Sequence, residues 1–276
     1  LPQQTTLGLD PAPSSISTDI PHASKGAKLV GAAGILLPVL EQGLPITAPV
    51  LRSAMTSVFG APDAEGAWVW KDAYEACEAA VVLFLKKHLA LMHQSAASPD
   101  ALLAMLLRLG ALLPTQTRRS ADSTLYQQFS TPLDLAYVAA FAADITATDH
   151  VLEPSAGTGM LAVHALAPGA SLTLNELAIT RADILASVFG EASLTRFNAE
   201  QIDDYLPRRV IPSVVLMNPP FSAKAYVTGT ARGTDMLHLT SALHRLAPGG
   251  RLVAITSADC TPAHPDTADA FAKITP

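Results

Sequence analysis

An amide, two prolines and an aromatic residue follow directly on a short apolar run, in the order Asn218-Pro219-Pro220-Phe221. The run, residues 213–217, is rich in β-branched side chains and bounded by proline, a pattern typical of a strand buried on both faces. Ligands of open α/β sheets bind outside the carboxyl ends of the strands. Proline can neither continue a helix nor donate the backbone hydrogen bond that a strand ladder needs. We therefore expect a fixed, exposed turn that presents Asn218 and Phe221 to a ligand.

A glycine loop follows an earlier predicted strand and opens a helix, in the order Glu153-Pro154-Ser155-Ala156-Gly157-Thr158-Gly159. Glycines allow a tight turn and a close approach of ligand to backbone, and the free N–H groups of the helix terminus face the same space. The loop lacks the Gly-Lys-Ser/Thr sequence that grips phosphate. The carboxylate of Glu153 would repel a pyrophosphate, but it could attract a cationic amino group.

Two further strand ends carry polar residues suited to a nucleoside. Glu176 lies about twenty residues after the glycine loop, where a carboxylate can accept both hydroxyls of a ribose. Phe197-Asn198-Ala199 offers an apolar face and an amide to an adenine ring. The simpler alternatives are that Glu176 only solvates a strand end and that Asn198 is only a turn residue.

The elements needed to position these groups follow from the pattern of the second half of the chain. Predicted strands alternate with helical segments, which is typical of βαβ units and a doubly wound parallel sheet. The expected strands are residues 150–153, 170–176, 194–198, 213–217 and 251–256, and the expected helices are 131–143, 159–167, 177–189 and 234–246. The sequence therefore predicts an α/β fold for this half.

The first half predicts helices instead. Residues 47–60 combine a Thr cap and an early proline with apolar residues at helical spacing, and helical patterns follow from 64 to 92 and from 98 onward. We predict a flexible arm at 1–24, a helical domain at 25–113 with its own core, a linker at 114–124 and the α/β domain at 125–276. The aromatic residues of the helical domain are interpreted as packing.

Composition limits the classes of protein. Hydrophobic residues make up 49% and charged residues 15% of the 276 residues, which is typical of a globular protein. The apolar stretches fall short of the ~20 residues that a membrane helix needs, and no signal peptide is visible. Cys77 and Cys260 suggest neither a disulfide framework nor a zinc site, and Cys260 with His264 is not interpreted as a metal site. We therefore expect a reducing, cytoplasmic location, with no membrane partner and no metal.

The net charge of −6 does not favour broad contact with nucleic acid. Any such contact must come from a local patch or from a further part of the protein. Lys224, Arg232 and Arg245 follow the Asn218 motif and are candidate phosphate contacts, although a solvated loop explains them equally well. The chain begins at Leu1 rather than at Met, so we expect a fragment of a longer protein.

Taken in order, these motifs resemble the class I S-adenosylmethionine-dependent methyltransferases. The order is Phe129-Ser130-Thr131-Pro132, the loop 153–159, Glu176, Asn198 and then Asn218-Pro219-Pro220-Phe221. More narrowly, it resembles the adenine-N6 DNA methyltransferases in which the cofactor motifs precede Asn-Pro-Pro-aromatic. The helical half, with residues 59–68 and 70–74, resembles the N-terminal methylase region of bacterial strawberry-notch-like proteins, which precedes a helicase-like part.

The resemblance implies a Rossmann-like methyltransferase domain, S-adenosylmethionine as cofactor and a role for each motif. The methionine end would be held by the segment Phe129, Thr131 and Pro132. The amino acid moiety would lie in the loop of Glu153, Pro154, Ser155, Ala156, Gly157 and Gly159. Glu176 would take the ribose beside Leu177, and Asn198 with Ala199 would meet the adenine. Asn198 departs from the usual Asp of the family.

The resemblance also implies a catalytic role for the turn and DNA as substrate. The Asn218 side-chain oxygen and the Pro219 carbonyl would accept hydrogen bonds from an exocyclic amine, while Pro220 stiffens the turn and Phe221 stacks on a base swung out of the duplex. Two alternatives remain. The acceptor could be RNA or a protein glutamine, or the chain could be a catalytically weak binding module of a larger helicase-like protein.

Overall fold

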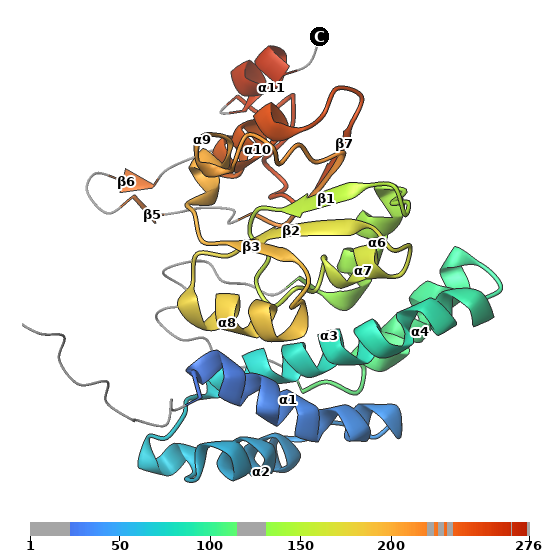
Figure 1. Ribbon diagram of the computed structural model, residues 1–276, viewed down its shortest axis with the longest axis vertical. Helices are drawn as coiled ribbons and strands as arrows, with labels where there is room; N and C mark the ends of the chain where they lie inside the picture. Colours follow the sequence, from blue (N-terminus) through green and yellow to red (C-terminus); the bar gives the residue numbers. More distant parts are fainter. Residues whose placement is uncertain are drawn as a thin grey trace, which may run out of the picture.

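The centre of the molecule is a five-stranded, wholly parallel sheet in the order β3-β2-β1-β4-β7 (Figure 1). The computed structural model describes residues 23–114, 131–219, 224–225, 229–230, 234–265 and 267–274. The strands are β1 His150–Glu153, β2 Ser171–Asn175, β3 Ser193–Thr195, β4 Val214–Met217 and β7 Arg251–Ala254. This order confirms the predicted Rossmann-like α/β fold. A two-stranded hairpin, β5 Lys224–Ala225 with β6 Gly229–Thr230, lies apart from the sheet.

The order of the strands reverses between β1 and β4. The chain runs outward through β1, β2 and β3 on one side, and through β4 and β7 on the other. In open parallel sheets such a switch point leaves a crevice outside the carboxyl ends of the two central strands. The loops that follow Glu153 and Met217 both leave the sheet at this point. The fold therefore brings the glycine loop and the Asn218 turn to one edge.

Side chains of the central strands alternate between two buried clusters. Val151, Val214 and Leu216 belong to the larger cluster, whereas Leu152 and Val215 belong to the smaller one on the opposite face. This is the period of two that a strand imposes on its side chains. All four residues of β4 are buried, as the apolar run predicts for a strand covered on both faces.

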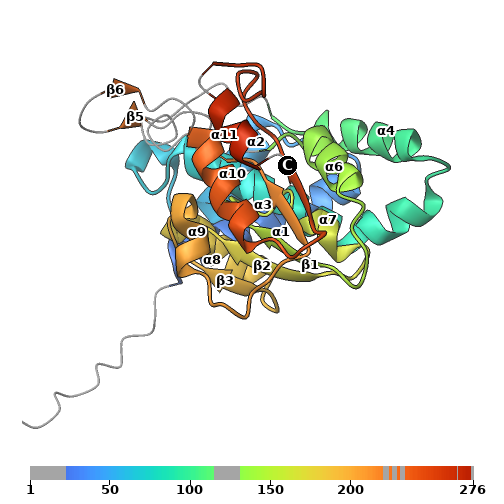
Figure 2. The same ribbon diagram turned by 90° about the horizontal axis from the view of Figure 1, so that it is seen from above.

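Helices cover both faces of the sheet (Figures 1 and 2). The larger cluster is shared with α6 Leu133–Ala142, α7 Val163–Leu166 and α8 Ile179–Val188, and the smaller one with α9 Ile202–Tyr205, α10 Thr234–Arg245 and α11 Ala268–Ile274. The short helices α9 and α11 were not expected from the sequence.

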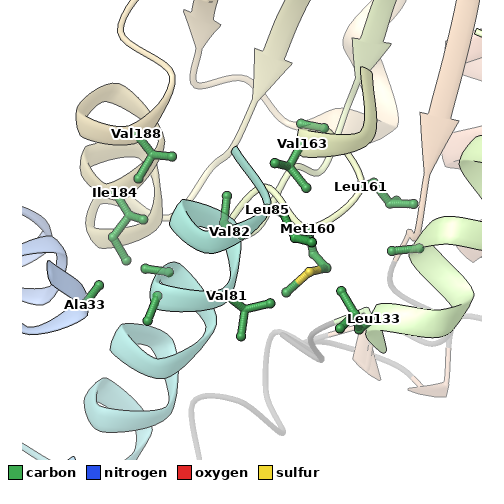
Figure 3. Packing of buried hydrophobic residues seen from close by; sticks show 14 of the residues in the cluster. Ala33, Val81, Val82, Leu85, Leu133, Met160, Leu161, Val163, Ile184 and Val188 are labelled. Carbon is green, nitrogen blue, oxygen red and sulfur yellow. The ribbon is translucent and has the colours of Figure 1, made fainter. Parts of the chain in front are cut away.

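The N-terminal helices add a further layer outside α7 and α8 (Figure 1). They are α1 Lys25–Glu41, α2 Ala48–Phe59, the 3-10 turn η1 Asp63–Glu65, α3 Trp70–Ser95 and α4 Pro99–Gly110. Figure 3 shows Val81, Val82 and Leu85 of α3 beside Val163 of α7 and Ile184 of α8. One continuous cluster of buried residues therefore joins the helical layer to the sheet, rather than the separate core expected for the helical domain. The domain boundaries stay a prediction.

Gly26 allows α1 to lie close against α8. A Cβ atom at this position would come within 2.3 Å of the Asp183 Cβ and 2.6 Å of the Thr180 carbonyl oxygen. Backbone atoms cannot yield as a flexible side chain can, so any larger residue would push the two helices apart. Ser24 caps α1 by accepting a hydrogen bond from the Ala27 N–H at 3.2 Å.

Several predicted boundaries were wrong for identifiable reasons. The helix expected from residue 64 begins at Trp70, because Gly66 has a φ of +77° and ends the 3-10 turn that precedes it. The helix expected over 159–167 is confined to Val163–Leu166, since Gly159, with a φ of +92°, lies in the left-handed region. The strand expected at 194–198 ends at Thr195, where the chain turns toward the site.

The aromatic segment between α2 and α3 is held by Asp63. Its two carboxylate oxygens accept hydrogen bonds from Arg52 Nε and Trp70 Nε1, each at 3.0 Å. The Arg52 guanidinium also lies 5.2 Å from the Trp70 ring centre, and the Trp68 indole donates to the Ala61 carbonyl. These contacts fit the interpretation that the aromatic residues of the helical half serve packing.

Within the described part of the chain, no helix is long and apolar enough to cross a bilayer. The same ranges hold no group of three or more His, Cys, Asp or Glu side chains placed to bind a metal ion. Cys77 and Cys260 are both buried free thiols.

Asp149 fastens the amino ends of the neighbouring strands β1, β4 and β7. Its carboxylate accepts hydrogen bonds from the Ser213 hydroxyl at 2.7 Å, from the Thr146 N–H at 2.8 Å and from Arg251 Nη2 at 2.8 Å. Burial raises the pKa of this carboxyl, but the hydrogen bonds and the Arg251 charge outweigh burial and lower the pKa to about 2. The folded state therefore holds the Asp149 proton less tightly than the unfolded state does.

We expect Asp149→Asn to lower the free energy of unfolding by about 2 kcal/mol at pH 7, because each pKa unit corresponds to ~1.4 kcal/mol. Since the folded pKa is depressed, this contribution is present above a pH of ~4 and is lost as the pH falls toward 2. Urea unfolding from pH 7 to pH 2, with Asp204→Asn on the exposed surface as control, checks the effect. A difference between wild type and variant that does not change with pH would contradict it.

Candidate functional site

The glycine loop is shaped by its contact with α8. At Gly159 an added Cβ would lie 2.3 Å from Cε2 of the Phe189 ring, and the backbone φ of +92° is itself unfavourable for any other residue. The loop therefore turns tightly against the C-terminal end of α8, as the glycines of the sequence predict.

Glu176 lies at the end of β2 and supports this loop. One carboxylate oxygen accepts the Gly157 N–H and the other accepts the Ala178 N–H, each at 2.8 Å. A carboxylate has about four acceptor positions, so two remain for a ligand. Burial raises the pKa of Glu176, which is 8% exposed, while the charge of Arg181 and the two backbone donors oppose the rise.

Asn175 is a positioning residue that sequence reasoning missed. Its amide nitrogen donates to the Pro154 carbonyl at 2.8 Å and to the Phe197 carbonyl at 3.0 Å. Its oxygen accepts from the Phe197 N–H at 2.8 Å and from the Thr195 hydroxyl at 2.9 Å. One buried side chain thus joins the ends of β1, β2 and β3. The signal in the sequence was an amide at the end of an otherwise apolar strand.

Glu153 lies beneath the loop rather than on its open side. It is 2% exposed, and its Oε2 atom has no hydrogen-bond partner among the described residues. Burial raises the pKa of Glu153 well above its usual range, the Ala162 N–H opposes this rise, and the charge of Glu176 adds to it. A cationic group close to the loop would favour the carboxylate form of Glu153 through its charge.

Helix α3 brings further carboxylates to the loop. Arg181 Nε donates to Glu75 Oε1 at 2.9 Å, and both side chains are buried. The Thr158 hydroxyl of the loop donates to Glu78 at 3.3 Å. Four carboxyl groups, those of Glu75, Glu78, Glu153 and Glu176, therefore lie around the loop together with the Arg181 guanidinium. The carboxyl groups outnumber the single guanidinium, which favours a cationic ligand over a phosphate-bearing one.

Sequence reasoning missed this contribution of α3. Glu75 and Arg181 are 106 residues apart, so neither residue marks the other in the sequence. The spacing of Glu75 and Glu78, which places both on one face of a helix, was the available signal.

Asn218 follows β4 and is oriented by Thr131. The Asn218 amide nitrogen donates to the Thr131 hydroxyl oxygen at 3.0 Å. The Asn218 Oδ1 atom is buried and has no hydrogen-bond partner among the described residues. Burying an unpaired acceptor is costly, so the arrangement is suited to a donor supplied by a ligand. Pro132 precedes α6 and Pro219 is buried beside the motif.

The expected adenine edge is only partly formed by side chains. Asn198 is exposed, and its oxygen accepts the Glu200 N–H at 3.2 Å as the cap of the 3-10 turn η2 Ala199–Gln201. Ala199 is buried. Leu177 is 56% exposed and offers an apolar surface next to Glu176. Because the Asn198 oxygen is used in this cap, the Asn198 amide nitrogen is the group that remains to donate to a ligand.

Some predicted residues lie outside the described part of the chain. They are Phe129, Pro220, Phe221 and Arg232, together with the side chain of Lys224. The interpretation of Arg245 as a phosphate contact was wrong. Its guanidinium donates to the carbonyl oxygens of Pro207 at 2.7 Å and Val210 at 2.6 Å and so fixes the loop before β4.

No protein-family model and no curated protein sequence matches this chain. Several solved structures can be superimposed on part of its fold. A candidate class I S-adenosylmethionine-dependent methyltransferase from Listeria monocytogenes is 11% identical, with 91% of this chain and 78% of that chain covered and a TM-score of 0.46. A type I restriction-modification methyltransferase subunit from Streptococcus thermophilus is 16% identical, with 87% and 62% covered and a TM-score of 0.45.

A candidate RNA methyltransferase from Pyrococcus horikoshii is 21% identical, with 63% of this chain and 80% of that chain covered and a TM-score of 0.44. The assignment of the fold rests on the strand order of this chain and not on these overlaps.

Asn175→Ala should loosen the glycine loop, because it leaves two carbonyl groups and one N–H unpaired at the strand ends. We expect the free energy of unfolding to fall by about 2–4 kcal/mol and amide exchange to rise at residues 154–159 and 195–199. Thr195→Val is the matched control, since it removes one of the same four hydrogen bonds and should cost about 1 kcal/mol. Equal losses in both variants would rule out the joining role of Asn175.

Proposed function

We propose that this protein transfers a methyl group from S-adenosylmethionine to the exocyclic N6 amine of adenine in DNA. The observation that carries the proposal is the buried, unpartnered Oδ1 atom of Asn218, at the carboxyl end of the strand next to the glycine loop. An acceptor held in this way suits a neutral planar amine that arrives with its own N–H groups.

The residues around the glycine loop fit the proposed cofactor. The carboxyl groups of Glu75, Glu78 and Glu176 near the loop suit a ligand with an ammonium and a sulfonium charge. The two free acceptor positions of Glu176 suit the hydroxyls of a ribose, and exposed Leu177 suits the face of an adenine ring. When bound, the cofactor supplies a methyl group on a positively charged sulfur, ready for attack by a nucleophile.

The acceptor side must make a poor nucleophile reactive. The lone pair of an exocyclic amine is spread into the ring. Hydrogen bonds from the amine to Asn218 Oδ1 and to the Pro219 carbonyl would localise that lone pair and stabilise the positive charge that grows on nitrogen during transfer. Because the Asn218 amide nitrogen donates to the Thr131 hydroxyl, the Asn218 oxygen would be the group left to face the amine. Phe221 is proposed to stack on the base after it leaves the duplex.

The choice of DNA adenine rests on the order of the motifs, with the cofactor loop preceding Asn-Pro-Pro-aromatic. Lys224 and Arg232 are proposed phosphate contacts, and a helicase-like continuation of the chain is a proposed partner that would help an acidic protein reach DNA. RNA adenine or a protein glutamine amide would present a planar nitrogen to the same acceptors.

Two observations favour a second candidate, a binding module without turnover. The Asn198 oxygen already caps a 3-10 turn, and the net charge of the chain is −6. Both features would weaken cofactor and nucleic-acid binding relative to an active enzyme.

Transfer of labelled methyl groups separates these functions. We expect label in duplex DNA that contains adenine, and none in a duplex with hypoxanthine in place of adenine, because hypoxanthine has no exocyclic amine. Label in RNA or protein alone would replace the proposed acceptor. Cofactor binding without transfer to any acceptor would favour the binding module.

Asn218→Ala removes the proposed acceptor. We expect turnover to fall by about a hundredfold or more, the size of effect seen when one preorganised polar group is lost, with the Kd for S-adenosylmethionine unchanged. Calorimetry and the methylation assay measure the two effects. If the variant lost cofactor binding as well, the assignment of Asn218 to the acceptor side would be wrong.

Thr131→Val tests whether Thr131 orients Asn218 or holds the cofactor. Without the hydroxyl the Asn218 side-chain amide can rotate by half a turn and exchange its oxygen and nitrogen. We therefore expect kcat to fall by about tenfold, the equivalent of one hydrogen bond, while the Kd for the cofactor stays the same. Thr131→Ser keeps the hydroxyl and should retain most of the activity. A raised cofactor Kd with unchanged kcat would place Thr131 at the methionine end instead.

A further inference from the structure

A cavity lies between α3, α6 and α7, with a volume of about 390 Å³. It is lined by His93 near the end of α3, by Tyr137 and Phe141 of α6, and by His164 of α7. Asp144 and Pro168 complete the rim and wall. A volume of this size suits a molecule of one or two rings.

This cavity is separate from the glycine loop. Glu78 of α3 contacts the loop, whereas His93 of the same helix lines the cavity. Fifteen residues of α-helix span about 22 Å, so the two places lie far apart along α3. A ligand in the cavity would therefore not occupy the proposed cofactor site.

His164 gives the cavity an unsatisfied polar group. The side chain is 4% exposed, and both ring nitrogens lack a hydrogen-bond partner among the described residues. Burial, together with the neighbouring His93, lowers the pKa of His164 to about 3, so the imidazole is neutral at physiological pH. A neutral imidazole carries one donor and one acceptor, and a ligand with complementary groups would satisfy what the protein leaves unpaired.

The wall beside His164 is a row of rings. The Tyr137 ring centre lies 6.0 Å from that of His164 and 6.1 Å from that of Phe141. Tyr137 is buried and fixed by a hydrogen bond from its hydroxyl to the Pro99 carbonyl at 3.3 Å, whereas Phe141 is 60% exposed. Aromatic walls of this kind favour flat aromatic ligands, which pack on them at ring separations of ~4.5–7 Å.

The rim carries a carboxylate, that of Asp144, just after the end of α6. Asp144 is exposed and has a φ of +47°, an unusual value for a residue other than glycine. Arg251 Nη2 donates to the Asp144 carbonyl at 3.2 Å, and the Asp144 N–H donates to the Phe141 carbonyl at 3.1 Å. These bonds hold the turn in place beside the cavity. The exposed carboxylate favours amines over acids as ligands of the cavity.

We propose that this cavity binds a flat heteroaromatic amine of one or two rings. The ring packs against Tyr137 and Phe141, a ring nitrogen or N–H group pairs with His164, and the amine faces Asp144. The three features are independent, because each favours a different property of the ligand. The aromatic wall favours a flat ring, the imidazole favours a ring edge that can form hydrogen bonds, and the carboxylate favours a positive charge.

Titration of the protein with 2-aminobenzimidazole, followed by NMR and calorimetry, tests the proposal. We expect a Kd of about 1 mM or lower for the wild type, a range in which small ligands bind formed pockets. His164→Phe keeps a ring but removes both nitrogens, so it should weaken binding at least tenfold. Phe141→Ala changes an exposed residue and should also weaken binding, whereas Leu91→Ala, exposed on α3 outside the cavity, should not.

Naphthalene-2-carboxylate is the matched ligand, because it has two rings and the opposite charge. It should bind at least tenfold more weakly than the amine, and Asp144→Asn should reduce this difference. Equal affinity of the amine for wild type and His164→Phe would overturn the proposal. So would displacement of the amine by S-adenosylhomocysteine, which would place it in the cofactor site, or a lack of binding to the wild type at 10 mM, roughly ten times the expected Kd.

Discussion

The site depends on polar groups that must be paired at the end of β2. Asn175 and Glu176 lie next to each other there, one neutral and one carboxylate, and between them they accept or donate the hydrogen bonds that hold the loops after β1 and β3. These side chains are buried, and leaving any of them unpaired would cost more than a typical bond contributes. The geometry of the glycine loop is therefore set by the need to satisfy these two side chains, and the loop in turn defines where a ligand can lie.

The N-terminal helices belong to the same arrangement. α3 places Glu75 against Arg181 and Glu78 against Thr158, so carboxylates of the helical layer pair with a guanidinium of α8 and a hydroxyl of the glycine loop. The same helix packs Val81, Val82 and Leu85 into the core shared with α7 and α8 (Figure 3). Removing the helical layer would expose this apolar surface and leave Arg181 without Glu75, at a cost that buried charges make large.

Local pattern was enough to predict the sheet and the loop, but not the contacts between them. The strand at 214–217 and the loop at 153–159 could be located because a buried strand has an apolar run and a tight turn has glycine. The Thr131 contact with Asn218 spans 87 residues, and the roles of Asn175 and Arg181 depend on partners from other strands and helices. Such pairings follow from the three-dimensional register, which periodicity does not encode. Helix starts were misplaced where a backbone in the left-handed region, as at Gly66 and Gly159, overrode the apolar spacing.

The buried pair of Glu75 and Arg181 also bears on the order in which the protein is made. Glu75 leaves the ribosome 106 residues before Arg181, and in the finished protein both side chains are almost wholly enclosed. A carboxylate cannot be enclosed without its partner except at high cost, so α3 cannot settle into its final place while the chain ends before α8. Helices α1 to α3 are thus synthesised before the sheet on which they pack, and their apolar faces remain exposed to chaperones or to wrong partners for that interval.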